Sequence, residues 1–268
     1  MIEPDPKRLK TEDAPYELVY WHGLPGRGEF IRLLFVEAGV PWKDTSDKGM
    51  EASTGQVLEL ISPDSGPSVQ GKNPPVCAVP ALRHGDVLLS QTPNILQYLA
   101  PRLGLAPKEG VAVYHLNQIV LTLIDGFVNE LHDTHHPISV SAYYEDQKPE
   151  AKKRSKFFIE ERIPKFLGYA QRVLDAETSG EGPWLYGDSL TYADLVLFQS
   201  IDGTQFAFPK TFQKLKESGK YDGVFKLYET IKERPAIKEY LASDKRQKYG
   251  DGIWRHYPEL EEEDEKKE

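Results

Sequence analysis

The chain has 268 residues, of which 39% are hydrophobic and 28% are charged, a composition typical of a folded globular protein. Its formal net charge of -9 argues against a nucleic-acid partner, because neutralising phosphates requires a basic surface. The single cysteine, Cys77, excludes an intramolecular disulfide and an all-cysteine metal site.

No segment approaches the roughly 18 consecutive apolar residues of a membrane-spanning helix, and the first 15 residues lack the apolar core of a secretory signal. We therefore expect a cytoplasmic protein with no membrane partner. Both ends are polar, and residues 259–268 hold seven acidic residues and two lysines. The sequence predicts a disordered extension over residues 1–14 and a disordered acidic tail over residues 259–268.

The first elements read as strand, helix and strand. The β-branched and aromatic run YELVYW predicts a short strand, and the HGLPG that follows predicts a loop. Apolar residues at helical spacing mark a buried helix face over residues 30–38, which stops at Gly39. The segment VPWKD is a second candidate strand. Residues 46–75, rich in Gly, Pro, Ser and Asp, predict an irregular excursion with one helical hint at 57–61.

A hairpin and a helix follow the excursion. The segment VCAVPALRHGDVLLS holds two apolar runs on either side of a His-Gly-Asp turn, which is a hairpin signature. Thr92 suits the N-cap and Pro93 the first position of the next helix. The order of elements predicts a thioredoxin-like α/β domain over residues 15–103.

The remainder contains no convincing strand. Apolar residues keep a three-to-four spacing from Val113 to Leu131 and from Phe157 to Leu174, which predicts two long amphipathic helices. Pro164 is a candidate kink in the second. With shorter helical segments further along, an all-helical C-terminal domain is predicted over residues 108–258.

On these elements the chain resembles the tyrosine type of cytosolic glutathione transferase, the group that includes the mu, pi, alpha and sigma classes. The resemblance covers roughly residues 16–245. In that family a tyrosine closes the first strand and a loop and helix with an Arg-Gly-Arg and Ile-Arg pattern follow. Here Tyr20-Trp21 is followed by GRGEFIR, after a loop that is one residue longer than usual.

The resemblance implies that Tyr20 activates the glutathione sulfur. A free thiol has a pKa of about 8.5, so little of it is thiolate at neutral pH. A hydroxyl that donates a hydrogen bond to the thiolate contributes about 1.5 to 3 kcal/mol, which lowers the thiol pKa by about one to two units. We expect Tyr20 to act as a neutral donor, because ionising its phenol would require a shift of about three units.

The resemblance also implies a glutathione site around two further pairs. Val79-Pro80 stands where the family has a cis-proline, next to which an extended peptide pairs with the backbone. Gln91-Thr92 stands where the family grips the γ-glutamyl end at a helix start. Taken alone, the first pair is an ordinary proline beside a strand and the second a plain N-cap.

Four other residues are carried over from the family pattern. Arg27 and Lys72 would meet carboxylates of glutathione, and the Trp42 indole would donate to its glycyl end. Glu130 falls near an acidic residue that reaches the γ-glutamyl amine across the family's dimer interface.

The segment GDSLTYADL resembles the family's capping box, with Thr191 as the cap and Asp194 reaching back.

Two other features are given no chemical role. The cluster of His132, His135 and His136 has no matching Cys or carboxylate group, so we expect a solvated helix end and no metal. Cys77 is expected to be a small core residue.

The resemblance therefore implies a glutathione transferase that acts in detoxification. Glutathione is the expected co-substrate, and its thiolate is expected to attack a hydrophobic electrophile. The acceptor pocket is expected to be apolar, with walls from Trp21, Leu24, Tyr114 and Phe206. A homodimer is expected from the resemblance. Two alternatives stay open: a glutathione-dependent isomerase or biosynthetic lyase, and a non-catalytic binding or structural module with the same fold.

Overall fold

A computed structural model describes residues 14–262. The chain divides into two compact units, and the boundary in the sequence falls between Leu99 and Ala100. The predicted N-terminal extension lies outside the described residues, apart from its last residue, Ala14, which is buried. Residues 263–268 of the predicted acidic tail also lie outside them.

The first unit is built on a four-stranded sheet in the order β2-β1-β3-β4. Strand β1 (Tyr16–Val19) runs parallel to β2 (Trp42–Asp44) and antiparallel to β3 (Ala81–His84), which pairs in turn with β4 (Val87–Ser90). This sheet confirms the thioredoxin-like α/β prediction, because the parallel pair is joined through a helix and the antiparallel pair through a tight hairpin.

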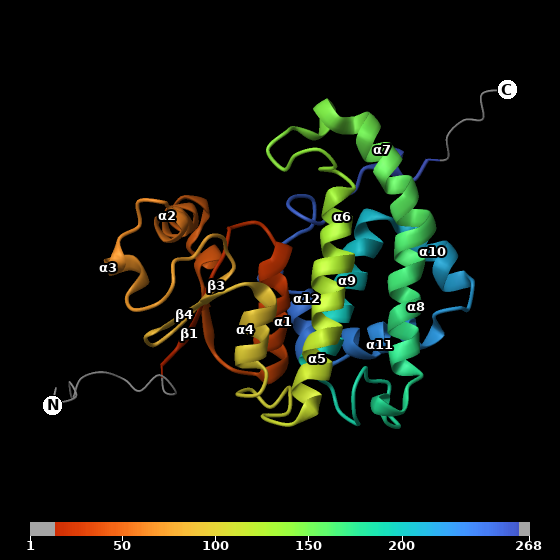
Figure 1. Ribbon diagram of the computed structural model, residues 1–268, viewed down its shortest axis with the longest axis horizontal. Coiled ribbons are helices and arrows are strands. Elements are labelled where there is room, and N and C mark those ends of the chain that lie inside the picture. Colours follow the sequence, from red (N-terminus) through yellow and green to blue (C-terminus); the bar gives the residue numbers. More distant parts are fainter. Residues whose placement is uncertain (1–13, 263–268) are drawn as a thin grey trace. The chain divides into compact units, whose positions relative to one another are not determined.

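Helices cover both faces of this sheet. Helices α1 (Glu29–Ala38) and α4 (Thr92–Leu99) lie side by side on one face, and α2 (Met50–Ile61) lies on the other, followed by the short α3 (Pro67–Gln70) (Figure 1). Under α2, an apolar cluster joins the helix to the sheet; its buried members are Val19, Val57, Leu60, Val76, Ala81 and Leu88. Helix α1 ends at Gly39, whose φ of 65° is the left-handed conformation that glycine adopts without cost.

The prediction of an irregular excursion over residues 46–75 is wrong for the first part of that range. A 3₁₀ turn (Thr45–Lys48) and the twelve-residue helix α2 occupy it. The buried face of α2 is narrow and partly polar, formed by Ser53, Val57 and Leu60, while Met50 and Leu58 are exposed. The packing of those three residues under the sheet stabilises a helix whose Ser-Thr-Gly centre has low intrinsic propensity.

The second unit is helical throughout its regular structure, which confirms the all-α prediction. Helix α5 (Val111–Leu121) continues through a π-helical segment (Thr122–Val128) into α6 (Asn129–Asp133). This 23-residue run is long and apolar enough to cross a membrane by length and composition, yet its inward face is the core of the unit. The buried residues on that face are Leu116, Ile119, Val120, Leu123, Ile124, Phe127, Val128 and Leu131.

The other predicted long helix is also interrupted by a π-helical segment. Helix α7 (Lys148–Phe157) follows a 3₁₀ turn (Tyr144–Gln147) and leads through Phe158–Arg162 into α8 (Ile163–Leu174). After a 3₁₀ turn (Glu177–Ser179), the remaining elements are α9 (Tyr192–Ala207), α10 (Pro209–Glu217), α11 (Asp222–Lys232), α12 (Pro235–Leu241) and a final 3₁₀ turn (Pro258–Leu260).

The start of α9 carries the predicted capping box between Thr191 and Asp194. Both oxygens of the fully buried Asp194 carboxylate are used, one by the Thr191 N–H at 2.7 Å and the other by the Leu185 N–H at 2.7 Å. The box therefore fixes the helix and also the loop that leads into it. Burial raises the pKa of Asp194 to about 6 against these hydrogen bonds.

Three expectations need correction. The acidic tail does not begin at residue 259, because Glu259 pairs with Lys148 at 2.7 Å and Glu261 accepts the Thr211 N–H at 2.8 Å. The histidine cluster is not a fully solvated helix end, since His135 is 1% exposed. Cys77 is exposed and not a core residue, because it precedes β3 in a segment whose inward position is taken by Val76.

Candidate functional site

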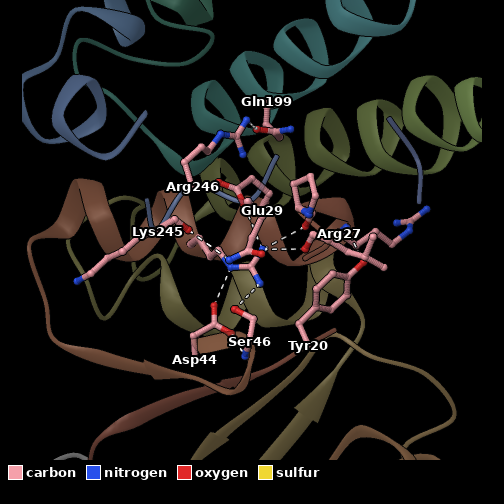
Figure 2. Close-up of polar contacts among 12 residues, drawn as sticks. Tyr20, Arg27, Glu29, Asp44, Ser46, Gln199, Lys245 and Arg246 are labelled. Carbon is pink, nitrogen blue, oxygen red and sulfur yellow. Dashed lines mark hydrogen bonds and ion pairs between the residues drawn. The ribbon is translucent and has the colours of Figure 1, made fainter. Parts of the chain in front are cut away.

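Tyr20 follows directly after β1, at the C-terminal end of the parallel strand pair. Its side chain is 7% exposed, and its hydroxyl accepts the backbone N–H of Arg27 at 2.9 Å (Figure 2). Its backbone is held from two other elements: its N–H donates to Thr45 Oγ1 at 2.9 Å, and its carbonyl accepts from the hydroxyls of Thr45 and Ser53 at 2.9 Å each. The residue is therefore fixed at both ends.

The loop after Tyr20 folds back against the phenol ring because two of its residues have no side chain. A Cβ on Gly26 would lie 2.2 Å from the Tyr20 hydroxyl, and one on Gly28 would lie 2.7 Å from Tyr20 Cδ1. This close approach brings the amide of Arg27, between the two glycines, to the hydroxyl. Glycine at both positions is thus a geometric requirement of the site.

A buried ion-pair network holds the loop in place. The Arg32 guanidinium, 2% exposed, donates to Asp44 Oδ2 at 2.7 Å and to Glu29 Oε2 at 3.1 Å. It also donates to the carbonyls of Leu24 and Pro25 at 3.2 and 3.3 Å, which ties the loop to the helix. A buried guanidinium needs this many acceptors to offset its lost hydration.

This network was missed from the sequence. Glu29 and Arg32 stand three residues apart on a helix that is otherwise apolar over FIRLLF, with both side chains on its buried side. A charged pair at such spacing in a buried helix was the available signal. Asp44, at the end of β2, completes the network and also accepts the Ser46 N–H at 2.8 Å, which starts the 3₁₀ turn that carries Thr45.

The electrostatic setting keeps the phenol neutral. Burial raises the pKa of Tyr20 above its usual value, and the Arg27 N–H and the charges of Arg32 and Arg27 offset only part of that rise. Since the hydroxyl accepts from Arg27, its own proton is available for another group. Among residues 14–262 no acceptor for this proton is found.

The start of α4 lies beside this hydroxyl. Thr92 is buried, and its Oγ1 donates to the carbonyl of Arg27 at 3.4 Å. Gln91 has a φ of 71°, a left-handed conformation that no other non-glycine residue of the described chain adopts. The Gln91 carbonyl accepts the Ile95 N–H at 2.9 Å, so Gln91 is the N-cap and Thr92 the first helical residue, one position earlier than predicted.

Val79-Pro80 also reaches this end of the sheet. The antiparallel register pairs Val19 with Ala81, so one further step puts Pro80 opposite Tyr20. The Val79-Pro80 peptide bond is cis, as the resemblance implies. Tyr20, Arg27, Pro80 and Thr92 are thus brought together from four segments of the sequence.

Two predicted residues lie elsewhere in the sheet. Trp42 pairs with Tyr16, four residues before Tyr20, which corresponds to about 13 Å along the strands. Its indole stacks on Phe35 with ring centres 5.4 Å apart, and the structure does not bring it to Tyr20. A tryptophan at the N-terminal end of β2 cannot reach the C-terminal edge where Tyr20 lies.

Lys72 is placed by its neighbour. The Asn73 side chain donates to the Asp86 carbonyl at 2.8 Å and accepts the Leu88 N–H at 3.1 Å, which anchors this loop near the hairpin turn. That turn is at the end of β3 and β4 remote from Ala81 and Ser90. Lys72 itself is exposed, and the structure does not bring it to Tyr20.

Glu130 belongs to the helical unit, on α6. Its two carboxylate oxygens accept from Arg162 Nε and Nη2 at 2.6 Å each, a bidentate pair that joins α6 to the end of the second π-helical segment. Its predicted role at a neighbouring subunit's site stays a prediction.

The four expected pocket walls are untested. Trp21 and Leu24 are half-buried, and Trp21 packs on the apolar cluster under α2. In the helical unit, Tyr114 is 72% exposed, and Phe206 packs against Tyr249 with ring centres 5.0 Å apart.

Comparison with known proteins relates both units to one family. Residues 132–244 match the family profile described as the glutathione S-transferase C-terminal domain. A glutathione S-transferase of Plasmodium falciparum is 25% identical over 238 residues, which is 87% of this chain and 98% of that protein.

Solved structures agree with the sequence matches. A pi-class glutathione S-transferase of Onchocerca volvulus superposes with a TM-score of 0.60 at 22% identity, over 84% of this chain and 91% of that one. A monomeric glutathione S-transferase of the hookworm Necator americanus has a TM-score of 0.59 at 21% identity, over 88% and 100% of the two chains.

Proposed function

Because this chain belongs to the glutathione transferase family, we propose that it binds glutathione and that the Tyr20 hydroxyl stabilises the thiolate for attack on an electrophile. The observation that carries the proposal is the buried, neutral Tyr20 hydroxyl, which accepts one hydrogen bond from the Arg27 amide and keeps its proton for another group.

The chemistry follows from that geometry. A hydroxyl that already accepts an N–H is polarised and becomes a better donor to an anion. A hydrogen bond to a thiolate contributes about 1.5 to 3 kcal/mol, which lowers the thiol pKa by about one to two units. The raised pKa of Tyr20 supports the neutral donor over an ionised base. The thiolate that results is the nucleophile, and the phenol keeps its own proton.

The proposed glutathione contacts are Arg27, Val79, Pro80, Gln91 and Thr92. The amides that open α4 suit a carboxylate, because a helix N-terminus carries partial positive charge. The strained conformation of Gln91 supports this choice, since an unfavourable φ at a helix start is retained where it aims backbone groups at a ligand. Trp42 and Lys72 are left out of the site.

The second substrate is proposed to be a hydrophobic electrophile, as in a detoxifying enzyme of the cytosol. Trp21, Leu24, Tyr114 and Phe206 remain the proposed walls of its pocket. All four carry large apolar or aromatic side chains that are at least partly exposed.

A homodimer is proposed on the strength of one exposed surface. Val111 and Leu121 of α5 present exposed apolar side chains, at 63% and 38% exposure. Apolar side chains left exposed on a core helix suit a protein contact. The sedimentation coefficient of the wild type distinguishes a dimer from a monomer. The measurement is needed because one similar protein is a monomer.

The proposal is tested by replacing Tyr20 with Phe and Tyr221 with Phe as the control. Tyr221 is a half-buried tyrosine before α11, remote in sequence from every proposed contact. We expect Tyr20→Phe to lower kcat/KM for glutathione conjugation of a chloronitrobenzene by about 10- to 100-fold, as the loss of one charge-assisted hydrogen bond requires. Tyr221→Phe should leave it unchanged.

Two further readouts separate the alternatives. The pKa of bound glutathione, followed by thiolate absorbance, should rise by about one to two units in Tyr20→Phe, while retention on immobilised glutathione persists. Retention of the wild type without conjugation would favour an isomerase, a lyase or a binding module. Equal turnover in the wild type and Tyr20→Phe would reject Tyr20 as the thiolate donor.

A further inference from the structure

A pocket of about 280 Å³ lies in the helical unit, and none of the residues proposed above is among those that line it. It is formed by the middle and second half of α5, the second half of α8 and the segment that follows α8 (Figure 1). The lining residues that matter below are Ile119, Tyr169, Arg172, Val173 and Tyr186, together with His115.

The walls of this pocket are formed in advance. The segment after α8 is closed on itself by the Gly187 N–H, which donates to the Thr178 carbonyl at 2.7 Å. The Ser179 hydroxyl donates to the Trp184 carbonyl at 2.5 Å. Tyr186 is joined to α5 by a hydrogen bond between its hydroxyl and His115 Nδ1 at 3.1 Å. A small ligand would therefore find an ordered cavity, which reduces the entropy lost on binding.

One polar group in the wall has no partner. The Tyr169 ring lines the pocket, and its hydroxyl oxygen is buried without a hydrogen bond to any of residues 14–262. Buried hydroxyls are nearly always paired, so an unpaired one at a cavity calls for an acceptor from outside the chain. Gln118 and Arg172, both exposed, are the long side chains among the lining residues that can swing aside as a ligand enters.

The charge at the rim has one sign. Arg172 is one helical turn beyond Tyr169, on the same side of α8, and makes no ion pair with another described residue. No acidic side chain lines the pocket, while Ile119, Val173 and the tyrosine rings make its interior apolar. The complement to such a cavity is a flat apolar group that bears a single negative charge.

We propose that this pocket binds a small aromatic carboxylate, with its ring against Ile119 and Val173 and its carboxylate near Arg172 and the Tyr169 hydroxyl. The site lies wholly within the helical unit and does not depend on the Tyr20 chemistry, so either can fail without the other.

The test uses the full-length chain and 4-fluorobenzoate, followed by fluorine NMR, with 4-fluorobenzyl alcohol as the uncharged probe. Arg172→Gln removes the charge, Tyr169→Phe removes the hydroxyl and Val173→Trp fills the cavity. Lys153→Gln, an exposed lysine of α7 outside the pocket, is the control for loss of one positive charge. Thermal unfolding of each variant establishes that it is folded.

We expect millimolar or tighter binding of fluorobenzoate by the wild type and by Lys153→Gln. Arg172→Gln and Tyr169→Phe should each weaken it at least fivefold, Val173→Trp should abolish it, and the alcohol should bind at least fivefold more weakly. Because the Tyr169 hydroxyl has no internal partner, Tyr169→Phe should not lower the unfolding temperature. Absence of binding, or equal binding by wild type and Val173→Trp, overturns the proposal.

Discussion

The Tyr20 side chain is positioned mainly by the absence of other side chains around it. Its hydroxyl accepts the amide of Arg27, and the residues on either side of Arg27 are glycines pressed against the ring. Gly26 has a φ of 41° in addition, so it meets both a steric and a conformational demand. The aim of the phenol therefore depends on positions that carry no functional group.

Gly26→Ala and Gly23→Ala form a matched pair that tests this. Both positions have positive φ, but a Cβ at Gly23 would meet nothing within 4 Å, whereas one at Gly26 would overlap the Tyr20 hydroxyl. Each should lose about 1 kcal/mol of stability from backbone strain. Gly26→Ala should in addition lose as much kcat/KM as Tyr20→Phe, while Gly23→Ala keeps wild-type turnover. Similar turnover in the two variants would show that the loop does not aim the phenol.

Gln91 offers a second test at the level of one residue. Its φ of 71° is unfavourable for a side chain but free for glycine, so Gln91→Gly should be more stable than Gln91→Ala by about 1 kcal/mol in denaturant unfolding. If the Gln91 side chain contributes to glutathione binding, both variants should lose affinity by the same factor. An affinity loss in Gln91→Ala alone would assign the effect to the backbone.

The two long helices of the second unit have the same kind of local irregularity. Each contains a π-helical segment, and Gly126 in the first faces Phe166 beyond the second, where a Cβ would lie 2.7 Å from the ring. Pro164 stands two residues after the end of the second segment. The kink predicted at this proline corresponds to a π-helical segment, a change that relieves the clash proline makes with the preceding turn.

The start of α10 is capped by a residue far away in the sequence. Glu261 accepts the N–H of Thr211 at 2.8 Å and that of Lys210 at 3.3 Å, as an N-cap side chain would, and its charge suits the helix N-terminus.

Glu261→Ala should therefore lower the free energy of unfolding by about 1 to 2 kcal/mol, measured by urea denaturation. Glu262→Ala, next to it and equally charged, should change it by less than about 0.5 kcal/mol, because Glu262 is exposed and makes no described contact. Equal effects would mean that the tail acts only through its overall charge.

On the scale of the whole helical unit, the C-terminal segment closes the fold. The His135 ring donates through Nε2 to the Ile253 carbonyl at 3.0 Å, and Trp254 is buried against Gly203 of α9. Tyr257 stacks on Tyr144 with ring centres 3.7 Å apart. The contacts of His135 and Tyr144 join residues more than a hundred positions apart, so they form only when the unit is complete.

His135 makes this closure sensitive to acid. Burial lowers the pKa of His135 to about 3, against about 6.5 in the unfolded chain. If the buried Nδ1 were protonated, its N–H would have no hydrogen-bond acceptor among the described residues. The unfolded state therefore binds the proton more tightly between these pH values, and the contribution of His135 is lost as pH falls.

Wild-type stability should fall by about 2 kcal/mol from pH 6.5 to pH 5 through this residue alone. In His135→Gln, the free energy of unfolding should fall by that much less over the same pH interval, whatever the stability of the variant at neutral pH. Urea unfolding at a series of pH values measures both changes. Parallel curves for the two proteins would contradict the assignment.

The sequence by itself determined the class of each half and the place of Tyr20 at the end of the first strand. The alternation of strands and helices before residue 100, the long apolar helices after it and the tyrosine at the end of the first strand are local patterns, and the structure follows them. Local patterns are readable because side-chain period and turn residues act within a few positions. The capping box of α9, which was predicted from its resemblance to the family's box, is also a pattern of a few neighbouring residues.

Tertiary structure alone decided which residues accompany Tyr20. Trp42 was assigned to the site from its sequence context, but strand register puts it at the far end of the sheet; Arg32, Asp44 and Ser53 were overlooked, although they hold Tyr20 and its loop. Helix α2, the burial of His135 and the cap from Glu261 likewise depend on contacts between distant segments. Register and long-range contacts are set by the packing of the whole core, which no short stretch of sequence encodes.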